Sequence, residues 1–101
     1  MKPLSGQTAL ITGAVRRIGR ATALELSELG AAIVINARSS REEAQAVQQE
    51  IQSAGGRAIV CLGDIRDEAF VAQMMGQTIE AFGRLDILVN NASIRADSEF
   101  L

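Results

Sequence analysis

Thr12-Gly13-Ala14-Val15-Arg16-Arg17-Ile18-Gly19-Arg20 is the stretch of the chain that decides the fold. It follows the short apolar run Thr8–Thr12 and leads directly into residues with helical spacing. Gly13 can adopt the backbone of a tight strand-to-helix turn, and Gly19 permits close packing between helix and sheet. Free N–H groups at the start of the helix favour a bound phosphate. We therefore predict a pyrophosphate-binding turn; the alternative is that both glycines only shape the turn.

The strand-then-helix pattern continues along the chain. Four β-rich runs are expected at Thr8–Thr12, Ala32–Asn36, Ala58–Leu62 and Asp86–Asn90. The stretches between them place apolar or small residues on one helical face: Ile18, Thr22, Leu26 and Leu29, then Ala44, Val47 and Ile51, then Val71, Met75 and Phe82. Strands that are apolar on both faces and joined by helices form parallel sheets. The sequence therefore predicts one α/β domain over residues 1–101, a doubly wound parallel sheet with strand order 3-2-1-4.

The ends of the expected helices carry clear signals. Gly30, Gly55-Gly56 and Gly83 follow the three helical stretches, and Asp67 stands where an N-cap would open the third. In the order 3-2-1-4 the fourth strand lies at an edge, although Ile87-Leu88-Val89 suits a strand covered on all sides. We therefore expect a sheet truncated after its fourth strand, and a homo-oligomer, because an apolar edge is rarely left in water.

Composition excludes several classes of function. The chain has 101 residues, 48% hydrophobic and 22% charged, with a net charge of −2 and scattered basic residues, so neither nucleic acid nor a membrane is an expected partner. Cys61 is the one cysteine and histidine is absent, which excludes an intrachain disulfide and a Cys/His metal cluster. No stretch approaches the ~20 apolar residues of a membrane span, so a cytoplasmic location is expected.

The end of the second expected strand bears on cofactor choice. Asn36-Ala37-Arg38-Ser39-Ser40 stands where a dinucleotide-binding βαβ unit meets the adenosine ribose, and it contains no carboxylate. Arg38, Ser39 and Ser40 would bind a 2′-phosphate, so NADP(H) is expected in preference to NAD(H). Two alternatives stay open: Arg38 is a solvated loop arginine, and Ser39 or Ser40 caps the second helix.

Two further motifs complete a family pattern: Leu62-Gly63-Asp64-Ile65 and Asn90-Asn91-Ala92-Ser93. Together with the glycine turn they resemble the short-chain dehydrogenase/reductases over nearly all of residues 5–95, which implies a Rossmann-type sheet and a small-molecule substrate. The resemblance implies that Asp64 binds the adenine amino group, that the backbone of Ile65 follows the ring, and that Asn91 and Ala92 support the sheet and line the cofactor. Arg16 would then lie beside Arg38, and Gly13, Arg17, Ile18 and Gly19 would surround the pyrophosphate.

One departure from the family pattern narrows the resemblance. The usual turn is Thr-Gly-x-x-x-Gly-x-Gly, whereas this chain has Arg17 at the middle glycine, as pteridine reductases do. These also tend to have Asn-Asn-Ala-Ser, as found here at 90–93. The resemblance implies that Arg17 holds the pyrophosphate and faces a pterin, and that Ser93 touches phosphate or substrate. Arg17 would equally suit a generic carbonyl reductase, and Ser93 would equally satisfy local backbone groups.

The catalytic residues of this family are not in the chain. Its members use a tyrosine as general acid and a lysine one helical turn away, both beyond the fourth strand, and this sequence contains no tyrosine. We therefore expect the NADP(H)-binding half of an oxidoreductase that is inactive alone. The competing hypothesis is a non-catalytic half-domain for binding or assembly. A flavodoxin-like regulator fits the motif order poorly.

Overall fold

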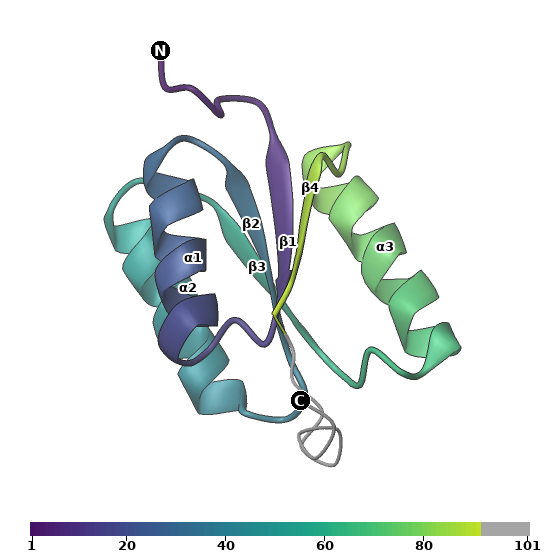
Figure 1. Cartoon of the computed structure of the whole chain (residues 1–101). Helices are drawn as coiled ribbons and strands as arrows, with labels where there is room; N and C mark the ends of the chain where they lie inside the picture. Colours follow the sequence, from purple (N-terminus) through teal and green to yellow (C-terminus); the bar gives the residue numbers. More distant parts are fainter. Residues whose placement is uncertain (92–101) are drawn as a thin grey trace, which may run out of the picture.

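The computed structural model describes residues 1–91, which form a four-stranded parallel sheet between two helical layers. The elements follow the order β1 (Thr8–Thr12), α1 (Arg17–Glu28), β2 (Ala32–Ala37), α2 (Arg41–Ser53), β3 (Ala58–Leu62), α3 (Glu68–Phe82) and β4 (Ile87–Asn90). Helices α1 and α2 cover one face of the sheet and α3 covers the other (Figure 1). The predicted Rossmann-type doubly wound fold is thus confirmed.

The strand order is β3-β2-β1-β4, and all three pairings are parallel. Two strand limits differ from those expected, since β2 extends to Ala37 and β4 begins at Ile87 rather than Asp86. The loops that follow β1, β2 and β3 all lie at the lower end of the sheet in Figure 1, where the carboxyl ends of the strands meet. This end of the sheet is where a doubly wound fold binds its ligand.

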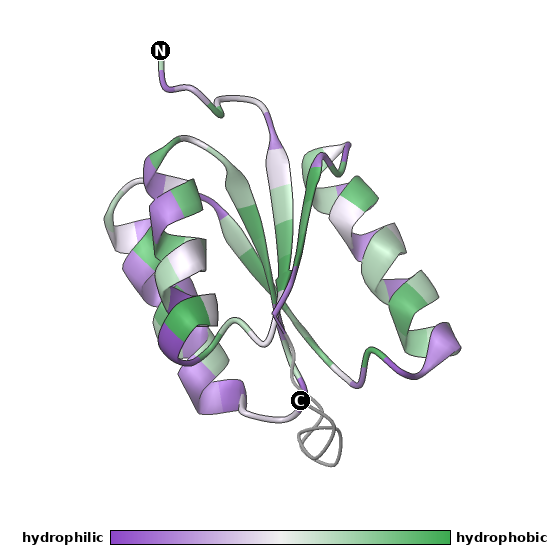
Figure 2. Cartoon of the chain, viewed as in Figure 1, coloured by the Kyte–Doolittle hydropathy of each residue, from purple (hydrophilic) through white to green (hydrophobic). Residues whose placement is uncertain are grey.

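The core lies on both faces of the central strands, where hydrophobic residues gather in the middle of the sheet (Figure 2). Every residue of β1 and β2 is buried. Ile11, Ile33 and Ile35 face α1 and α2, whereas Leu10 and Val34 face α3 with Met74 and Cys61. The Cys61 thiol is buried, burial raises its pKa, and its Sγ donates to the Gln77 Oε1 at 3.1 Å.

Helix α1 does not bury the face that its apolar residues indicate. The fully buried residues of α1 are Gly19, Ala23 and Ser27, whereas Ile18 is 72% exposed and the remaining three expected residues are half-buried, Leu26 among them packed against the core. Small side chains on this face let α1 approach the sheet closely, and one step along a helix turns a side chain by about 100°. The prediction was wrong for Ile18, and it missed the small residues because it considered apolar spacing and not side-chain size.

The other two helices agree better with the periodicity. Ala44, Val47 and Ile51 are the buried residues of α2, as predicted. In α3 the buried residues are Met74 and Thr78, and the three expected residues pack around them half-buried. The Asp67 carboxylate accepts hydrogen bonds from the N–H groups of residues 69 and 70, which confirms the N-cap.

The two edges of the sheet are β3 and β4. Leu88 of β4 is 60% exposed, and alternate residues of this strand are only half-buried. The expected edge position of β4 is therefore confirmed.

Among residues 1–91 no helix is long and apolar enough to cross a membrane. That the whole of residues 1–101 is one partial domain stays a prediction.

Candidate functional site

The turn between β1 and α1 forms the centre of the candidate site. Gly13 has a φ of 61°, a conformation that side chains other than hydrogen disfavour. A Cβ added to Gly19 would lie 2.0 Å from the Gly13 carbonyl oxygen, which is backbone and cannot move aside. Both glycines therefore have the roles that the sequence predicts, a tight turn and a close approach of α1.

Asn91 holds this turn against the end of β4. Its N–H donates to the Thr12 Oγ1 at 2.8 Å, and its side-chain amide donates to the Gly13 carbonyl at 3.5 Å. The Thr12 hydroxyl in turn lies 3.1 Å from the Asn90 Oδ1. Asn91 thus joins the end of β4 to the end of β1 and to the turn, while its expected contact with the cofactor stays a prediction. Ala92 and Ser93, the other expected contacts of this segment, lie outside the described residues.

Asn36 is a part of the site that the sequence reasoning missed. It is 2% exposed, and its side-chain amide donates to the carbonyls of Cys61 and Gly63 at 3.1 and 3.3 Å. Its own carbonyl accepts the Ala14 N–H at 3.1 Å. Asn36 therefore ties together the ends of β1, β2 and β3. The available signal was one polar residue at the end of an otherwise apolar strand, since buried amides are almost always hydrogen-bonded.

The start of α1 presents backbone donors at this end of the sheet. The hydrogen bond from the Arg20 N–H to the Arg16 carbonyl, 3.3 Å long, joins α1 to its N-cap residue. The N–H groups of Arg17, Ile18 and Gly19 precede Arg20, and such groups at a helix start have no carbonyl of their own helix to bind. They carry the positive end of the helix dipole, so an anion is stabilised here.

Arg17 adopts a conformation that favours glycine. Its φ is 50°, and it is the one non-glycine residue with positive φ among residues 1–91. The family's usual glycine at this place has a physical reason, since a left-handed backbone costs an L-residue about 1–2 kcal/mol. The arginine is thus held in a strained position at the head of the anion-binding helix, a pattern common at functional sites.

Replacing Arg17 tests this strain. We expect Arg17→Gly to raise the free energy of unfolding by up to about 1 kcal/mol, because glycine adopts positive φ without steric cost. Arg17→Ala removes the same guanidinium but keeps the strain, so it should show no gain in urea unfolding. Equal stability of the two variants would show that the backbone is not strained here.

The residues expected at the ribose lie at the carboxyl end of β2. The side chain of Arg38 is 72% exposed and Ser39 is exposed, so both are accessible to a ligand. Ser40 occupies the N-cap position of α2, yet its side chain makes no capping hydrogen bond. Ser40 is therefore the N-cap residue of α2, as the capping alternative states, but its hydroxyl does not cap the helix.

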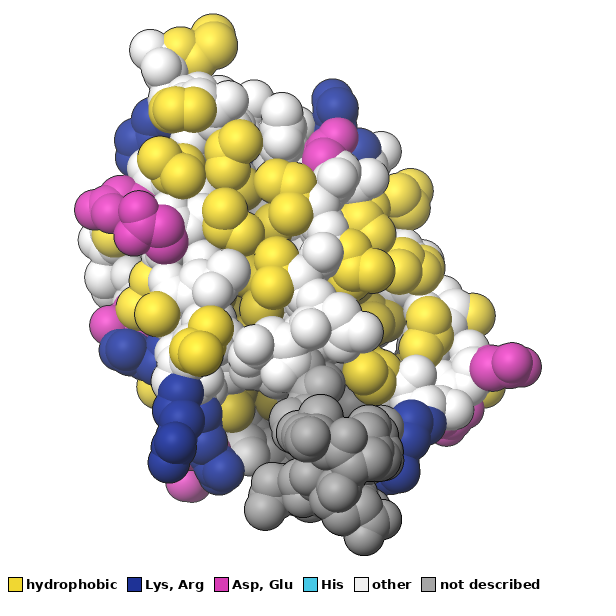
Figure 3. Space-filling view, in the orientation of Figure 1, with side chains coloured by type: hydrophobic (Ala, Val, Ile, Leu, Met, Phe, Trp, Pro, Cys, Tyr) yellow, Lys and Arg dark blue, Asp and Glu magenta, His cyan; other side chains and the backbone are white. Residues whose placement is uncertain are grey.

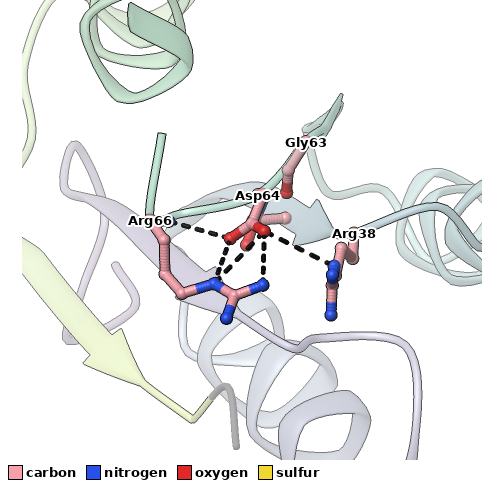
Figure 4. A network of polar contacts seen from close by, with 5 residues as sticks. Arg38, Gly63, Asp64 and Arg66 are labelled. Carbon is pink, nitrogen blue, oxygen red and sulfur yellow. Dashed lines mark hydrogen bonds and ion pairs between the residues drawn. The ribbon is translucent and has the colours of Figure 1, made fainter. Parts of the chain in front are cut away.

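Asp64 is the centre of a charged network at the end of β3 (Figure 4). Its carboxylate accepts the Arg66 N–H at 2.9 Å and the Arg66 guanidinium at 2.8 Å, and it lies 3.6 Å from the Arg38 Nε. The hydrogen bonds from Arg66 hold the pKa of Asp64 at about 2. The sequence reasoning missed Arg66. The signal was an Asp after a strand, because its carboxylate can accept the N–H of the residue two positions later in a turn. Ile65, between them, is half-buried.

The ionisation of Asp64 predicts a pH dependence. A pKa lowered in the folded state contributes stability above the unfolded value of about 3.9, and that stability is lost as the pH falls toward about 2. We expect Asp64→Asn to reduce the loss of stability between pH 4 and 2. NMR titration of the Asp64 carboxyl carbon checks the pKa, and a midpoint near 4 would contradict it.

Arg16 has a partner that the sequence reasoning missed, and its expected place beside Arg38 stays a prediction. Its guanidinium binds both carboxylate oxygens of Glu43 on α2, with Nη2–Oε1 at 2.9 Å and Nε–Oε2 at 3.2 Å. Arg38 forms its ion pair with Asp64. The sequence did not indicate Glu43, because ion pairs between residues 27 apart leave no local pattern. Among residues 1–91 no group of three or more potential ligands could hold a metal ion.

Comparison with known proteins identifies the family that has this geometry. The model of the short chain dehydrogenase family matches residues 7–101. The chain belongs to the short-chain dehydrogenase family. The members of this family are oxidoreductases, and the chain corresponds to a dinucleotide-binding half-domain of them.

Individual relatives agree with this assignment. The chain is 43% identical over 101 residues to a 3-oxoacyl-[acyl-carrier-protein] reductase from Synechocystis, covering 41% of that protein. It is 46% identical to versicolorin reductase from Emericella nidulans, with 90% of the chain and 34% of the relative covered. The chain thus spans less than half the length of these short-chain dehydrogenases.

Solved structures of the family share the fold. A dehydrogenase/reductase from Sinorhizobium meliloti has a TM-score of 0.86 and 47% identity, over 90% of this chain and 36% of that one. A short chain dehydrogenase from Burkholderia cenocepacia in complex with NADP has a TM-score of 0.85 and 46% identity, over 90% of this chain and 37% of that one. The chain therefore has the fold of a short-chain dehydrogenase that was solved with NADP bound.

Proposed function

We propose that this chain is the NADP(H)-binding half of a short-chain dehydrogenase and prefers NADP(H) over NAD(H). The observation that carries the preference is Arg38, whose exposed guanidinium follows β2 where the adenosine ribose is bound in this fold. No carboxylate stands among residues 36–40 to accept a free 2′-hydroxyl. The NADP complex of the Burkholderia cenocepacia relative supports the choice of cofactor.

The residues at the carboxyl ends of the strands fit the three parts of the adenosine end of the cofactor. The pyrophosphate would be bound by the N–H groups at the start of α1 and by Arg17, beside the turn that Gly13 and Gly19 permit. Arg38, Ser39, Ser40 and Arg16 would hold the 2′-phosphate. Asp64 and Ile65 would meet the adenine, with the Asp64 carboxylate ionised to accept its amino group.

In the intact enzyme the reaction would be hydride transfer between the nicotinamide and a carbonyl or pteridine-type substrate. The cofactor supplies the hydride chemistry; the residues described here bind and orient its adenosine end. The pteridine variant is supported by Arg17 at the usual glycine position and by Asn-Asn-Ala-Ser at 90–93. The names of two relatives, both reductases, support reduction as the direction.

The chain itself has no tyrosine to serve as general acid. We therefore expect the 101-residue chain to bind NADPH without oxidising it, whereas a longer polypeptide with a downstream Tyr-x-x-x-Lys should oxidise it. Absorbance at 340 nm, with dihydrobiopterin and 3-oxoacyl thioesters as trial substrates, measures this. Oxidation of NADPH by the 101-residue chain alone would contradict the expectation that this chain only binds the cofactor. Activity with thioesters only would contradict the pteridine assignment.

An assembly role is supported by one further observation. β4 is an edge strand with Leu88 exposed, and hydrophobic side chains gather over β1 and β4 on the face seen in Figure 3. We expect the chain to form a homo-oligomer, which light scattering at high concentration measures. A monomer would contradict both this expectation and the alternative of an assembly module. A cytoplasmic location and the absence of nucleic-acid and membrane partners remain proposals.

A further inference from the structure

The contact between Arg16 and Glu43 joins the two helices that flank the ribose end of the site. Arg16 is the residue before α1, and Glu43 is in the first turn of α2. Both carboxylate oxygens accept a hydrogen bond from the guanidinium, at 2.9 and 3.2 Å. This two-point geometry is the one in which an arginine also binds a phosphate group.

A second candidate ligand of the phosphate also contacts Glu43. Hydrogen bonds from the Arg16 guanidinium, and more weakly from the Ser40 hydroxyl, lower the pKa of the Glu43 carboxyl. The carboxylate is therefore ionised at neutral pH and bound to two groups that would otherwise face an anion. Basic side chains gather at this end of the α1–α2 layer (Figure 3), and the one lysine of the chain is Lys2 near the N-terminus, so these are arginines.

We propose that Glu43 is an internal counter-ion that competes with the 2′-phosphate for Arg16 and so lowers the affinity of the site for NADP(H). The inference rests on the proposed function, since it assumes a phosphate at the ribose. Arg16 and Glu43 have side chains 66% and 47% exposed. Exposed ion pairs are weak, so a dianionic phosphate can displace the carboxylate, and the exchange reduces the net gain of binding.

The other carboxylates near the site do not have this position. Asp64 lies 3.6 Å from Arg38, but its oxygens are already bound by Arg66, so Arg38 is held loosely. Glu42 is in the same turn of α2 as Glu43 and forms no ion pair within the part of the chain that the structure describes. Glu42 therefore offers a matched control with the same change of charge.

The test compares two nucleotides that differ only in the 2′-phosphate, adenosine 2′,5′-bisphosphate and 5′-AMP. We expect Glu43→Gln to lower the Kd of the bisphosphate about two- to fivefold and to leave the Kd of 5′-AMP unchanged, as measured by isothermal titration calorimetry on the purified protein. Glu42→Gln should produce a clearly smaller change. In the double variant Arg16→Gln/Glu43→Gln the gain should vanish, because it depends on the released guanidinium.

Three results would overturn the inference. The bisphosphate binds no more tightly to Glu43→Gln than to Glu42→Gln, or the gain persists without Arg16, or 5′-AMP gains as much as the bisphosphate. If the unmodified protein nevertheless binds the bisphosphate more tightly than 5′-AMP, the proposed function stands and only the role of Glu43 fails. If it binds both equally or neither, the proposed NADP(H) preference fails as well.

Discussion

Arg38→Asp should weaken the binding of NADPH by about ten- to a hundredfold and leave NADH binding nearly unchanged. A charge-assisted hydrogen bond contributes about 1.5–3 kcal/mol, which corresponds to that range, and the new carboxylate would also repel the phosphate. The exposed position of Arg38 at the end of β2 makes a large effect on folding unexpected. Fluorescence titration with the two reduced cofactors measures both affinities.

The control for Arg38→Asp is Arg57→Asp, which makes the same change of net charge. Arg57 precedes β3, so it lies at the amino ends of the parallel strands, whereas Arg38 lies at their carboxyl ends. Arg57→Asp should affect the two cofactors equally and weakly. The account of the 2′-phosphate is contradicted if Arg38→Asp leaves NADPH binding intact, or if it weakens NADH binding to the same extent. In either case Arg38 would be the solvated loop arginine that the sequence also allows.

Gly19→Ala should strongly destabilise the protein. The new Cβ would lie 2.0 Å from the Gly13 carbonyl oxygen and 2.7 Å from the Asn91 amide, so α1 must move away from the sheet. Inserting atoms into a packed contact typically costs 1–3 kcal/mol, and we expect about 3 kcal/mol or more here because one neighbour is backbone. Urea unfolding followed by circular dichroism gives the value.

Gly76 is the matched control, since it also lies within a helix but a Cβ there would meet nothing within 4 Å. Gly76→Ala should raise the free energy of unfolding by about 0.5–1 kcal/mol through helix propensity. The two substitutions therefore have opposite expected signs. If Gly19→Ala also stabilises the protein, α1 is not packed as closely on the turn as the structure has it.

The central strands were predictable because every residue of β1 and β2 is buried. Apolar runs such as Ile33–Ile35 are buried on both faces, and only a central parallel strand requires that. The motif after β1 was equally predictable, because Gly13 and Gly19 are required by backbone geometry and not by side-chain packing. For both features the sequence pattern and the physical constraint concern the same residues.

Other features depend on contacts that sequence spacing does not encode. The buried face of α1 was mispredicted because it includes Ala23 and Ser27, whose small side chains allow close packing. A search for hydrophobic spacing does not detect residues that are buried because they are small. The partners of Arg16 and Asp64 are exposed charges with several possible pairings, so the tertiary structure decides among them. The strain at Arg17 is visible only as a backbone angle.

The most direct test of the NADP(H) preference is calorimetric titration of the unmodified chain with NADPH and with NADH, while ¹⁵N NMR follows the backbone amides. The account predicts that NADPH binds at least about tenfold more tightly. The largest shifts should occur at residues 13–19, where α1 begins, and at Arg38. A folded sheet that binds the two cofactors equally, or binds neither, would contradict it.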